Sequence, residues 1–164
     1  MASQRRSYQT GHQPKCLVIV DESTEWDRAV RYAGRWAMRA QGGVVMLRII
    51  ETEEQNQQWL GVADLMRAEA HDEANSVLDR AARLASDVGA ITPERVIREG
   101  DPTEQILATI ENDSDIALLI LAANSGAEGP GPLVTHLTKS VGAFPIPVVI
   151  VPGDLNEADI DALS

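Results

Sequence analysis

Residues 115–152 read DIALLILAANSGAEGPGPLVTHLTKSVGAFPIPVVIVP, and this stretch decides the fold class. An apolar segment of strand length comes first, then a loop rich in small residues, a helical segment, and a second apolar segment. Two strands joined through a helix run parallel, because parallel neighbours need a crossover connection. The loop therefore lies at the carboxyl edge of a parallel sheet, which is where such sheets bind ligands.

The rest of the chain repeats this alternation. Apolar segments of strand length predict four strands, over 16–20, 44–50, 116–121 and 148–151, and residues 95–98 predict a further short strand between the second and third of these. Helical spacing of apolar residues predicts one helix after each of the first four strands, and the longest covers 62–88. Five strands and four helices with short links predict an α/β fold, an open five-stranded parallel sheet with helices on both faces.

Local signals place several helix ends. Thr24 and Asp27 have the spacing of a capping box before the first helix. Asp101 followed by Pro102 predicts a capped start of the third helix. The long second helix carries an apolar stripe from Met66 to Val88 along one face.

The length and the charge distribution divide the chain into three parts. At 164 residues it has room for one domain, which we place at residues 16–152. Residues 1–15 are polar, carry a charge of +3, and are predicted to be a flexible arm. Residues 153–164 form an acidic tail of charge −4, expected to make one loose helical turn or to trail in solvent.

The net charge of −11 limits the partners. A body this acidic repels nucleic acid and anionic membrane surfaces, so we expect neither as a partner. No apolar stretch approaches the ~20 residues of a membrane span, and residues 1–15 lack the hydrophobic segment of a signal peptide. Cys16 is the only cysteine, which excludes an internal disulfide. These features favour a cytoplasmic protein.

Two loops at the predicted carboxyl edge hold the candidate ligand residues. Asp21, Glu22 and Ser23 follow the first strand, and Asp21 either accepts a hydrogen bond from a base or ribose or begins the cap of the first helix. The loop after the fourth strand holds three glycines, Gly126, Gly129 and Gly131. Glycines let a phosphate approach the backbone closely, but a Gly-Pro-Gly-Pro run is also an efficient rigid turn.

Catalytic and metal motifs are missing from the sequence. It has no Walker-type lysine, no Gly-x-Gly-x-x-Gly after the first strand and no nucleophile elbow. The three histidines, at 12, 71 and 136, do not group with cysteine or carboxylates at a known ligand spacing. We therefore assign no catalytic residue, and no metal beyond the Mg²⁺ that accompanies ATP.

Three segments in this order resemble the universal stress protein family. They are VIVDES, REGDPTEQILATIENDSDIALLILA and PIPVVIVP, and the resemblance covers Cys16 to Pro152. It implies an adenine nucleotide alpha-hydrolase-like, Rossmann-like sheet with strand order 3-2-1-4-5. It also implies a non-catalytic stress-response protein that forms a homodimer through the last strand, Val148 to Val151. Some members of the family bind ATP and others do not.

The loop departs from the pattern of the nucleotide-binding members, which is glycine, two residues, glycine, nine residues, then glycine with serine or threonine. Ala123 stands at the first glycine and Gly126 at the second; seven residues follow, and Val134 with Thr135 stands at the end. The isopropyl group of Val134 would crowd phosphates on that backbone, whereas Gly129 and Gly131 offer room by another path.

The resemblance thus leaves two outcomes open, a crevice that binds ATP or AMP and a crevice that binds no nucleotide. The residues expected to hold the nucleotide are Asp21, Glu22, Ser23, Ala123, Asn124, Gly126, Gly129, Gly131 and Thr135. The alternative function is a weak ATPase or another ATP-dependent enzyme that uses the same crevice.

Overall fold

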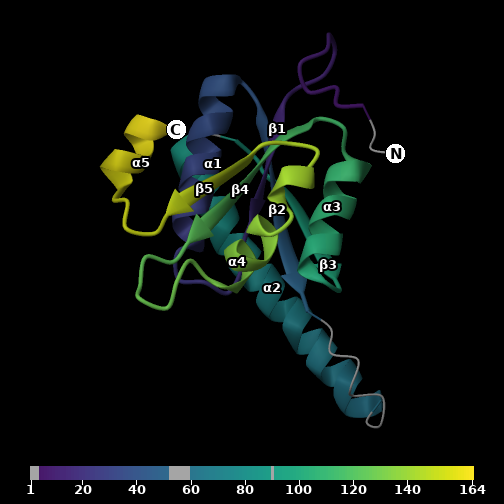
Figure 1. The fold of residues 1–164 in the computed structure, drawn as a ribbon. Coiled ribbons are helices and arrows are strands. Elements are labelled where there is room, and N and C mark those ends of the chain that lie inside the picture. The colour runs from purple at the N-terminus through teal and green to yellow at the C-terminus, as the bar shows by residue number, and fades with distance from the viewer. Residues whose placement is uncertain (1–3, 52–59, 90) are drawn as a thin grey trace.

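The computed structural model describes residues 4–51, 60–89 and 91–164 and contains one five-stranded parallel sheet (Figure 1). The strands are β1 (Lys15–Ile19), β2 (Gly43–Ile50), β3 (Glu94–Glu99), β4 (Ile116–Ala123) and β5 (Val148–Pro152). Their spatial order is β3-β2-β1-β4-β5. The helices are α1 (Trp26–Ala40), α2 (Leu60–Gly89), α3 (Pro102–Asn112), α4 (Pro132–Thr138) and α5 (Glu157–Leu163), with a 3₁₀ turn at Val141–Ala143. The predicted fold class and strand order are confirmed.

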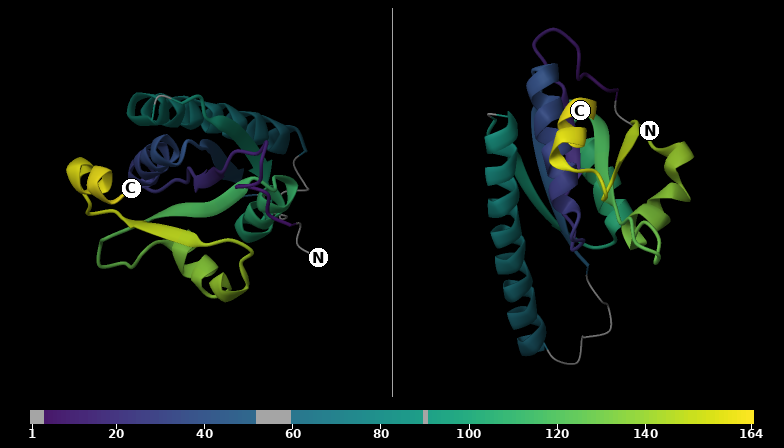
Figure 2. Two further views of the ribbon diagram at one scale, coloured as in Figure 1. Left: turned by 90° about the horizontal axis from the view of Figure 1, so that it is seen from above. Right: turned by 90° about the vertical axis from the view of Figure 1, so that its left-hand side faces the viewer.

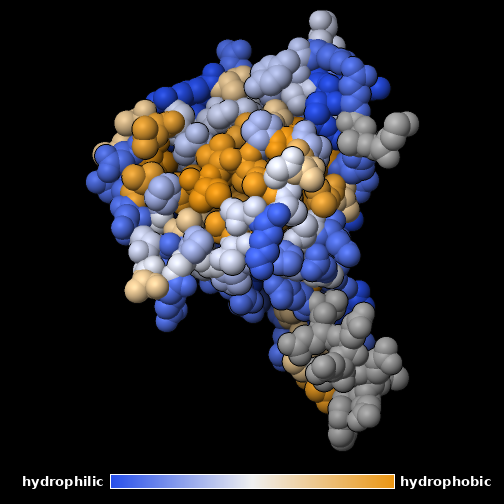
Figure 3. Space-filling model, viewed as in Figure 1, coloured by the Kyte–Doolittle hydropathy of each residue, from blue (hydrophilic) through white to orange (hydrophobic). Residues whose placement is uncertain are grey.

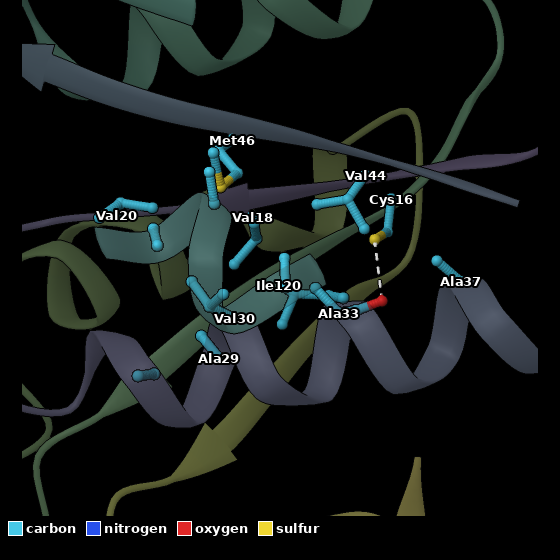
Figure 4. Packing of buried hydrophobic residues seen from close by; sticks show 14 of the residues in the cluster. Cys16, Val18, Val20, Ala29, Val30, Ala33, Ala37, Val44, Met46 and Ile120 are labelled. Atoms are coloured by element: carbon cyan, nitrogen blue, oxygen red, sulfur yellow. Dashed lines mark hydrogen bonds between the residues drawn. The ribbon is translucent and has the colours of Figure 1, made fainter. Parts of the chain in front are cut away.

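The sheet is covered on both faces, by α1 and α2 on one side and by α3 and α4 on the other (Figure 2). Successive residues of β1 face opposite layers. Cys16, Val18 and Val20 belong to the core under α1 and α2, which Figure 4 shows from close by. Leu17 and Ile19 belong to the core under α3 and α4. All five are buried, which explains why the sequence of a central strand is continuously apolar.

The helices α1 and α2 approach each other closely at two glycines. A Cβ atom on Gly89 would lie 2.5 Å from the carbonyl oxygen of Gly34. A Cβ atom on Gly34 would lie 2.6 Å from Cγ2 of Val88. Gly89, the last residue of α2, is therefore also a point where α2 packs on α1.

Only the second half of α2 packs on the sheet. Its buried residues begin at Ala74, whereas Val62, Leu65 and Met66 are more than half exposed. A helix of 30 residues is about 45 Å long, but a strand of eight residues spans only about 26 Å. The helix therefore projects beyond the sheet (Figure 1), and the predicted apolar stripe is buried only where a strand lies beneath it.

One of the two predicted caps is present. The carboxylate of Asp101 accepts a hydrogen bond from the backbone N–H of Glu104 at 3.0 Å, as expected for the start of α3. The prediction of a capping box at Thr24 is wrong. The hydroxyl of Thr24 instead donates to Oε1 of Glu25 at 2.8 Å, and α1 begins after Glu25 without a side-chain cap.

The N-terminal segment, expected to be a flexible arm, packs against the end of α3. The guanidinium of Arg5 donates from Nη1 to the carbonyl oxygens of Ile110 at 2.8 Å and Asp113 at 3.0 Å. The N–H of Arg6 donates to the carbonyl of Ser114 at 2.8 Å, and Ser7 is buried. Arg5 thus satisfies carbonyls that the end of a helix leaves without an intrahelical donor.

The acidic tail forms α5, which docks on α1 instead of trailing in solvent. The carboxylate of Asp161 accepts hydrogen bonds from Nε and Nη2 of Arg31, both at 2.8 Å. Arg39 donates to the carbonyl oxygen of Asp161 at 2.8 Å. Ile160 is inserted into the core cluster beneath α1 and is fully buried. A bidentate ion pair and one apolar anchor therefore hold this segment.

Candidate functional site

The candidate site lies where the order of strands reverses. β1 pairs with β2 on one side and with β4 on the other, so the loops that leave β1 and β4 diverge. Doubly wound sheets bind ligands in the crevice between such loops. Residues 20–25 follow β1 and residues 124–131 follow β4, so we take these two segments as the walls of the expected crevice.

Asp21 shapes the turn after β1. Its Oδ1 accepts the backbone N–H of Ser23 at 3.0 Å and the hydroxyl of Ser23 at 2.5 Å. The N-cap position of α1 is Glu25, four residues further on, so Asp21 does not cap that helix. Glu22 is exposed and approaches Nη2 of Arg48 at 3.6 Å. The carboxylates of this wall are thus held close to the carboxyl end of β1.

Arg48 is a residue of this site that the sequence reasoning missed. It lies in β2 and is buried, and its Nη1 donates to the carbonyl oxygen of Val20 at 3.2 Å. A buried arginine needs such acceptors, because an unpaired charge away from water is costly. The sequence signal that could have identified Arg48 is that it is the single charged residue in the otherwise apolar strand VVMLRII.

Glu25 packs beside the carboxyl end of β4. A Cβ atom on Gly153 would lie 2.5 Å from Cγ of Glu25 and 2.7 Å from the carbonyl oxygen of Ala123. The N–H of Gly153 donates to that same oxygen at 2.8 Å. The β1 wall therefore carries the carboxylates of Asp21, Glu22 and Glu25, and these accept hydrogen bonds from hydroxyl or amino groups but repel phosphate.

The loop over residues 124–131 is closed by its own hydrogen bonds. The N–H of Asn124 donates to the carbonyl of Pro130 at 3.0 Å, and the N–H of Gly126 donates to Oδ1 of Asn124 at 2.6 Å. The N–H of Gly129 donates to the carbonyl of Gly126 at 3.3 Å. Three backbone donors that a phosphate cradle would use therefore bind atoms of the loop itself.

Val134 does not crowd the crevice as the sequence comparison suggested. It is buried in the core under α3 and α4, because the apolar face of α4 packs on the sheet. Thr135, the next residue, is exposed. Ala123 ends β4, where it pairs with Pro152. The two substituted glycine positions thus serve packing and pairing in this chain.

A pocket of about 470 Å³ lies between the loop and α4. Its lining consists of Asn124, Glu128, Gly129, Gly131, Pro132, Thr135, His136 and Lys139. The structure thus brings together four of the predicted residues, Asn124, Gly129, Gly131 and Thr135. The other five, Asp21, Glu22, Ser23, Ala123 and Gly126, lie outside the lining.

His136 and Lys139 of this lining were not among the predicted ligand residues. They stand three residues apart on one turn of helix, the spacing that places two side chains on the same face. Across residues 4–51, 60–89 and 91–164, no three or more His, Cys, Asp or Glu side chains are placed to hold a metal ion. No helix in that part of the chain is both long and apolar enough to span a membrane.

A doubly wound α/β sheet with its crevice between β1 and β4 defines the class of this protein. The model of the universal stress protein family matches residues 14–152, and the chain belongs to that family. No curated protein matches the chain.

Solved structures share the fold. The universal stress protein UspA from Lactobacillus plantarum is 18% identical, with 84% of this chain and 97% of that chain covered and a TM-score of 0.72. A universal stress protein solved in complex with cAMP is 21% identical, with 83% and 96% covered and a TM-score of 0.57. One from Archaeoglobus fulgidus, in complex with dAMP, is 13% identical, with 84% and 96% covered and a TM-score of 0.56.

Proposed function

We propose that this chain is a non-catalytic stress-response protein that forms a homodimer through β5 and binds an adenine nucleotide, ATP or AMP, in the crevice between β1 and β4. The observation that carries the proposal is the contrast between the two walls of the crevice. The β1 wall presents carboxylates, which suit the amino group of a base or the hydroxyls of a ribose. The opposite wall presents the polar pocket at α4. The structures with cAMP and dAMP show adenine nucleotides bound by related folds.

The two edges of the sheet support the dimer. Four of the six residues of β3 are charged, Glu94, Arg95, Arg98 and Glu99, and charges on an edge strand discourage pairing with another strand. β5 has the sequence VVIVP and carries no charge. Figure 3 shows an apolar patch over this part of the surface, and Ile150 of β5 is exposed. A second copy paired at β5 would cover the patch and the free backbone groups of the strand.

Calorimetry on protein stripped of nucleotide tests the ligand. We expect heat with ATP and AMP, and cyclic AMP serves as the comparison. Asp21→Ala removes an acceptor whose charged hydrogen bond is worth about 1.5–3 kcal/mol, so affinity is expected to fall at least about tenfold. Asp21→Asn keeps a side-chain oxygen that can accept the hydrogen bonds from Ser23 but removes the negative charge. It therefore separates the effect of the charge from the effect of the turn. Asp87→Ala, an exposed acid on α2, is the control. If no nucleotide produces heat, the ligand part of the proposal fails.

Sedimentation equilibrium at micromolar concentration tests the dimer. Ile150→Lys places a charge on the β5 edge and is expected to give monomers. Leu65→Lys, at an exposed apolar residue of the projecting part of α2, is the matched control and leaves the dimer intact. A wild-type monomer at micromolar concentration contradicts the dimer.

The same preparations test the alternative of a weak ATPase. Turnover of ATP above a trace rate that Asp21→Ala abolishes would make the protein an enzyme and overturn the non-catalytic assignment. We also place the protein in the cytoplasm, in line with its single cysteine, which is buried and not disulfide-bonded.

A further inference from the structure

A second pocket, of about 440 Å³, lies between α3 and the edge strand β3. Its lining comes from β2, β3, β4, α3 and the turn after α3, and includes Val45, Glu94, Val96, Arg98, Thr109 and Asp113. It shares no lining residue with the pocket at α4. Its volume falls within the range of about 300–1,000 Å³ found for small-molecule sites.

The alternation of side chains along β3 places two opposite charges in this pocket. Arg95 faces α2, where it forms an ion pair with Asp79. Val96 packs against the core under α3 and α4, so Glu94 and Arg98, two residues before and after it, face the same layer. One wall of the pocket therefore carries a carboxylate and a guanidinium, about 13 Å apart along the strand.

Arg98 is held in position but lacks an anionic partner. Its Nε donates to Oε1 of Gln105 on α3 at 2.9 Å. A Cβ atom on Gly100 would lie 2.8 Å from Nε2 of Gln105, so the amide that orients the arginine is itself packed tightly. No carboxylate in the described part of the chain forms an ion pair with Arg98. Its Nη1 and Nη2 are thus available to a ligand, and such a fork binds a carboxylate through two parallel hydrogen bonds.

The other end of the pocket is negative. The Nζ atom of Lys15 lies 3.0 Å from Oε2 of Glu94 and 3.0 Å from Oδ2 of Asp113. Two carboxylates share one ammonium there, so this end repels a further anion. Apolar side chains of Val45 and Val96 lie between the two ends, and Val96 is only partly buried. The order along the pocket is guanidinium, apolar surface, carboxylates.

We propose that this pocket binds a small organic monocarboxylate, with the carboxylate on Arg98 and the apolar body on Val96. The site is separate from the crevice between β1 and β4 and does not depend on nucleotide binding. A dicarboxylate is disfavoured, because its second charge would lie toward Glu94 and Asp113. A neutral molecule of the same shape loses the charged hydrogen bonds to Arg98.

The test is a titration of isotope-labelled protein, followed through the NMR resonances of the backbone amides. The probes are hexanoate, its neutral amide hexanamide, and adipate, a dicarboxylate of the same chain length. Hexanoate is expected to shift the amides of Val96, Arg98 and Thr109 saturably. Hexanamide and adipate are expected to bind about tenfold more weakly.

Four variants assign the binding to these charges. Arg98→Gln is expected to lower the affinity for hexanoate about tenfold, and Arg98→Lys, which keeps the charge but not the fork, gives a smaller loss. Glu94→Gln, at an exposed position, raises the affinity for hexanoate several-fold and that for adipate further. Arg83→Gln removes a positive charge from the exposed surface of α2, on the other face of the sheet (Figure 2), and changes each affinity less than twofold.

Several results would overturn the proposed site. A wild-type protein without saturable shifts, or shifts confined to the loops after β1 and β4, would exclude a ligand here and leave the nucleotide function untouched. Equal affinities for hexanoate and adipate would exclude selection of monocarboxylates, and equal affinities for hexanoate and hexanamide would exclude an ion pair with Arg98. If the amide spectrum shows that Arg98→Gln is unfolded, Glu94→Gln decides, and an unchanged affinity in that variant contradicts the site.

Discussion

The substitution Ile160→Ala tests whether α5 is an integral part of the fold. Ile160 is the apolar anchor of a helix of seven residues, and its side chain lies in the same core cluster as Val30, Ala33 and Ala37 of α1. Polar attachments at the surface add to it: Arg31, Arg35 and Arg39 bind Asp161, and Arg31 also lies 3.8 Å from the carboxylate of Glu157. The isoleucine is therefore expected to supply most of the docking free energy.

The magnitude follows from the burial of the side chain. Truncation to alanine removes three carbon atoms at about 0.8 kcal/mol each and leaves a cavity, so the expected cost is about 2–4 kcal/mol. If α5 undocks while the rest of the chain stays folded, the loss of global stability is smaller, because it cannot exceed the free energy with which α5 docks. The expected result is local opening of α5 with the sheet intact.

Native-state amide hydrogen exchange measures this opening. The N–H groups of Ile160 and Ser164 donate to Asn156 and Ile160 within α5, both at 3.0 Å. A loss of 2 kcal/mol speeds their exchange about thirtyfold. Leu163→Ala, at an exposed position of the same helix, is the control and has little effect. Unchanged exchange in Ile160→Ala would refute the reasoning, since α5 would then be held without its anchor.

Three further outcomes follow from the structure. Gly34→Ala places a Cβ atom 2.6 Å from Cγ2 of Val88 and is expected to lower the free energy of unfolding in urea by about 1–3 kcal/mol. Val88→Ala should restore part of this loss, and an unchanged urea midpoint in Gly34→Ala contradicts the tight contact. Burial raises the pKa of the Cys16 thiol, so a thiol reagent should label it only in the denatured protein, and rapid labelling of the native fold would show that the thiol is accessible. Hydrogen bonds from Arg31 lower the pKa of Asp161, so the carboxylate stabilises the docked α5 at pH values above the ordinary pKa of aspartate. This stabilisation is lost as the pH falls through the lowered pKa. Amide exchange in α5, measured against pH, should show the loss, and Asp161→Asn should remove the pH dependence.

The central strands were accessible from the sequence because they are continuous apolar runs, whereas the strand order came from the resemblance to the universal stress protein family. Segments 16–20 and 116–121 are covered on both faces, so no polar position interrupts them. Asp101 with Pro102 marked the start of α3 correctly, since capping depends on adjacent residues. Features set by local chemistry or by full burial can be predicted from one sequence.

The features that were missed depend on contacts between distant residues. Arg31 and Asp161 are 130 positions apart, and no local pattern joins them. Arg5 finds its acceptors at the end of α3, more than a hundred residues away. Met66 continues the apolar stripe of α2, but its exposure follows from the length of the sheet. His136 became a candidate only when the structure showed the pocket between α4 and the loop.

The difference between the charged β3 edge and the apolar β5 edge also determines how far this sheet can grow. Two copies that meet at β5 by a two-fold axis use both apolar edges, and each outer end of the joined sheet is then a charged β3 strand. A head-to-tail contact of β5 with β3 would instead repeat without closing and build a filament. Such a contact would have to desolvate the charges of β3, so polymerisation is opposed and the proposed dimer would not extend further.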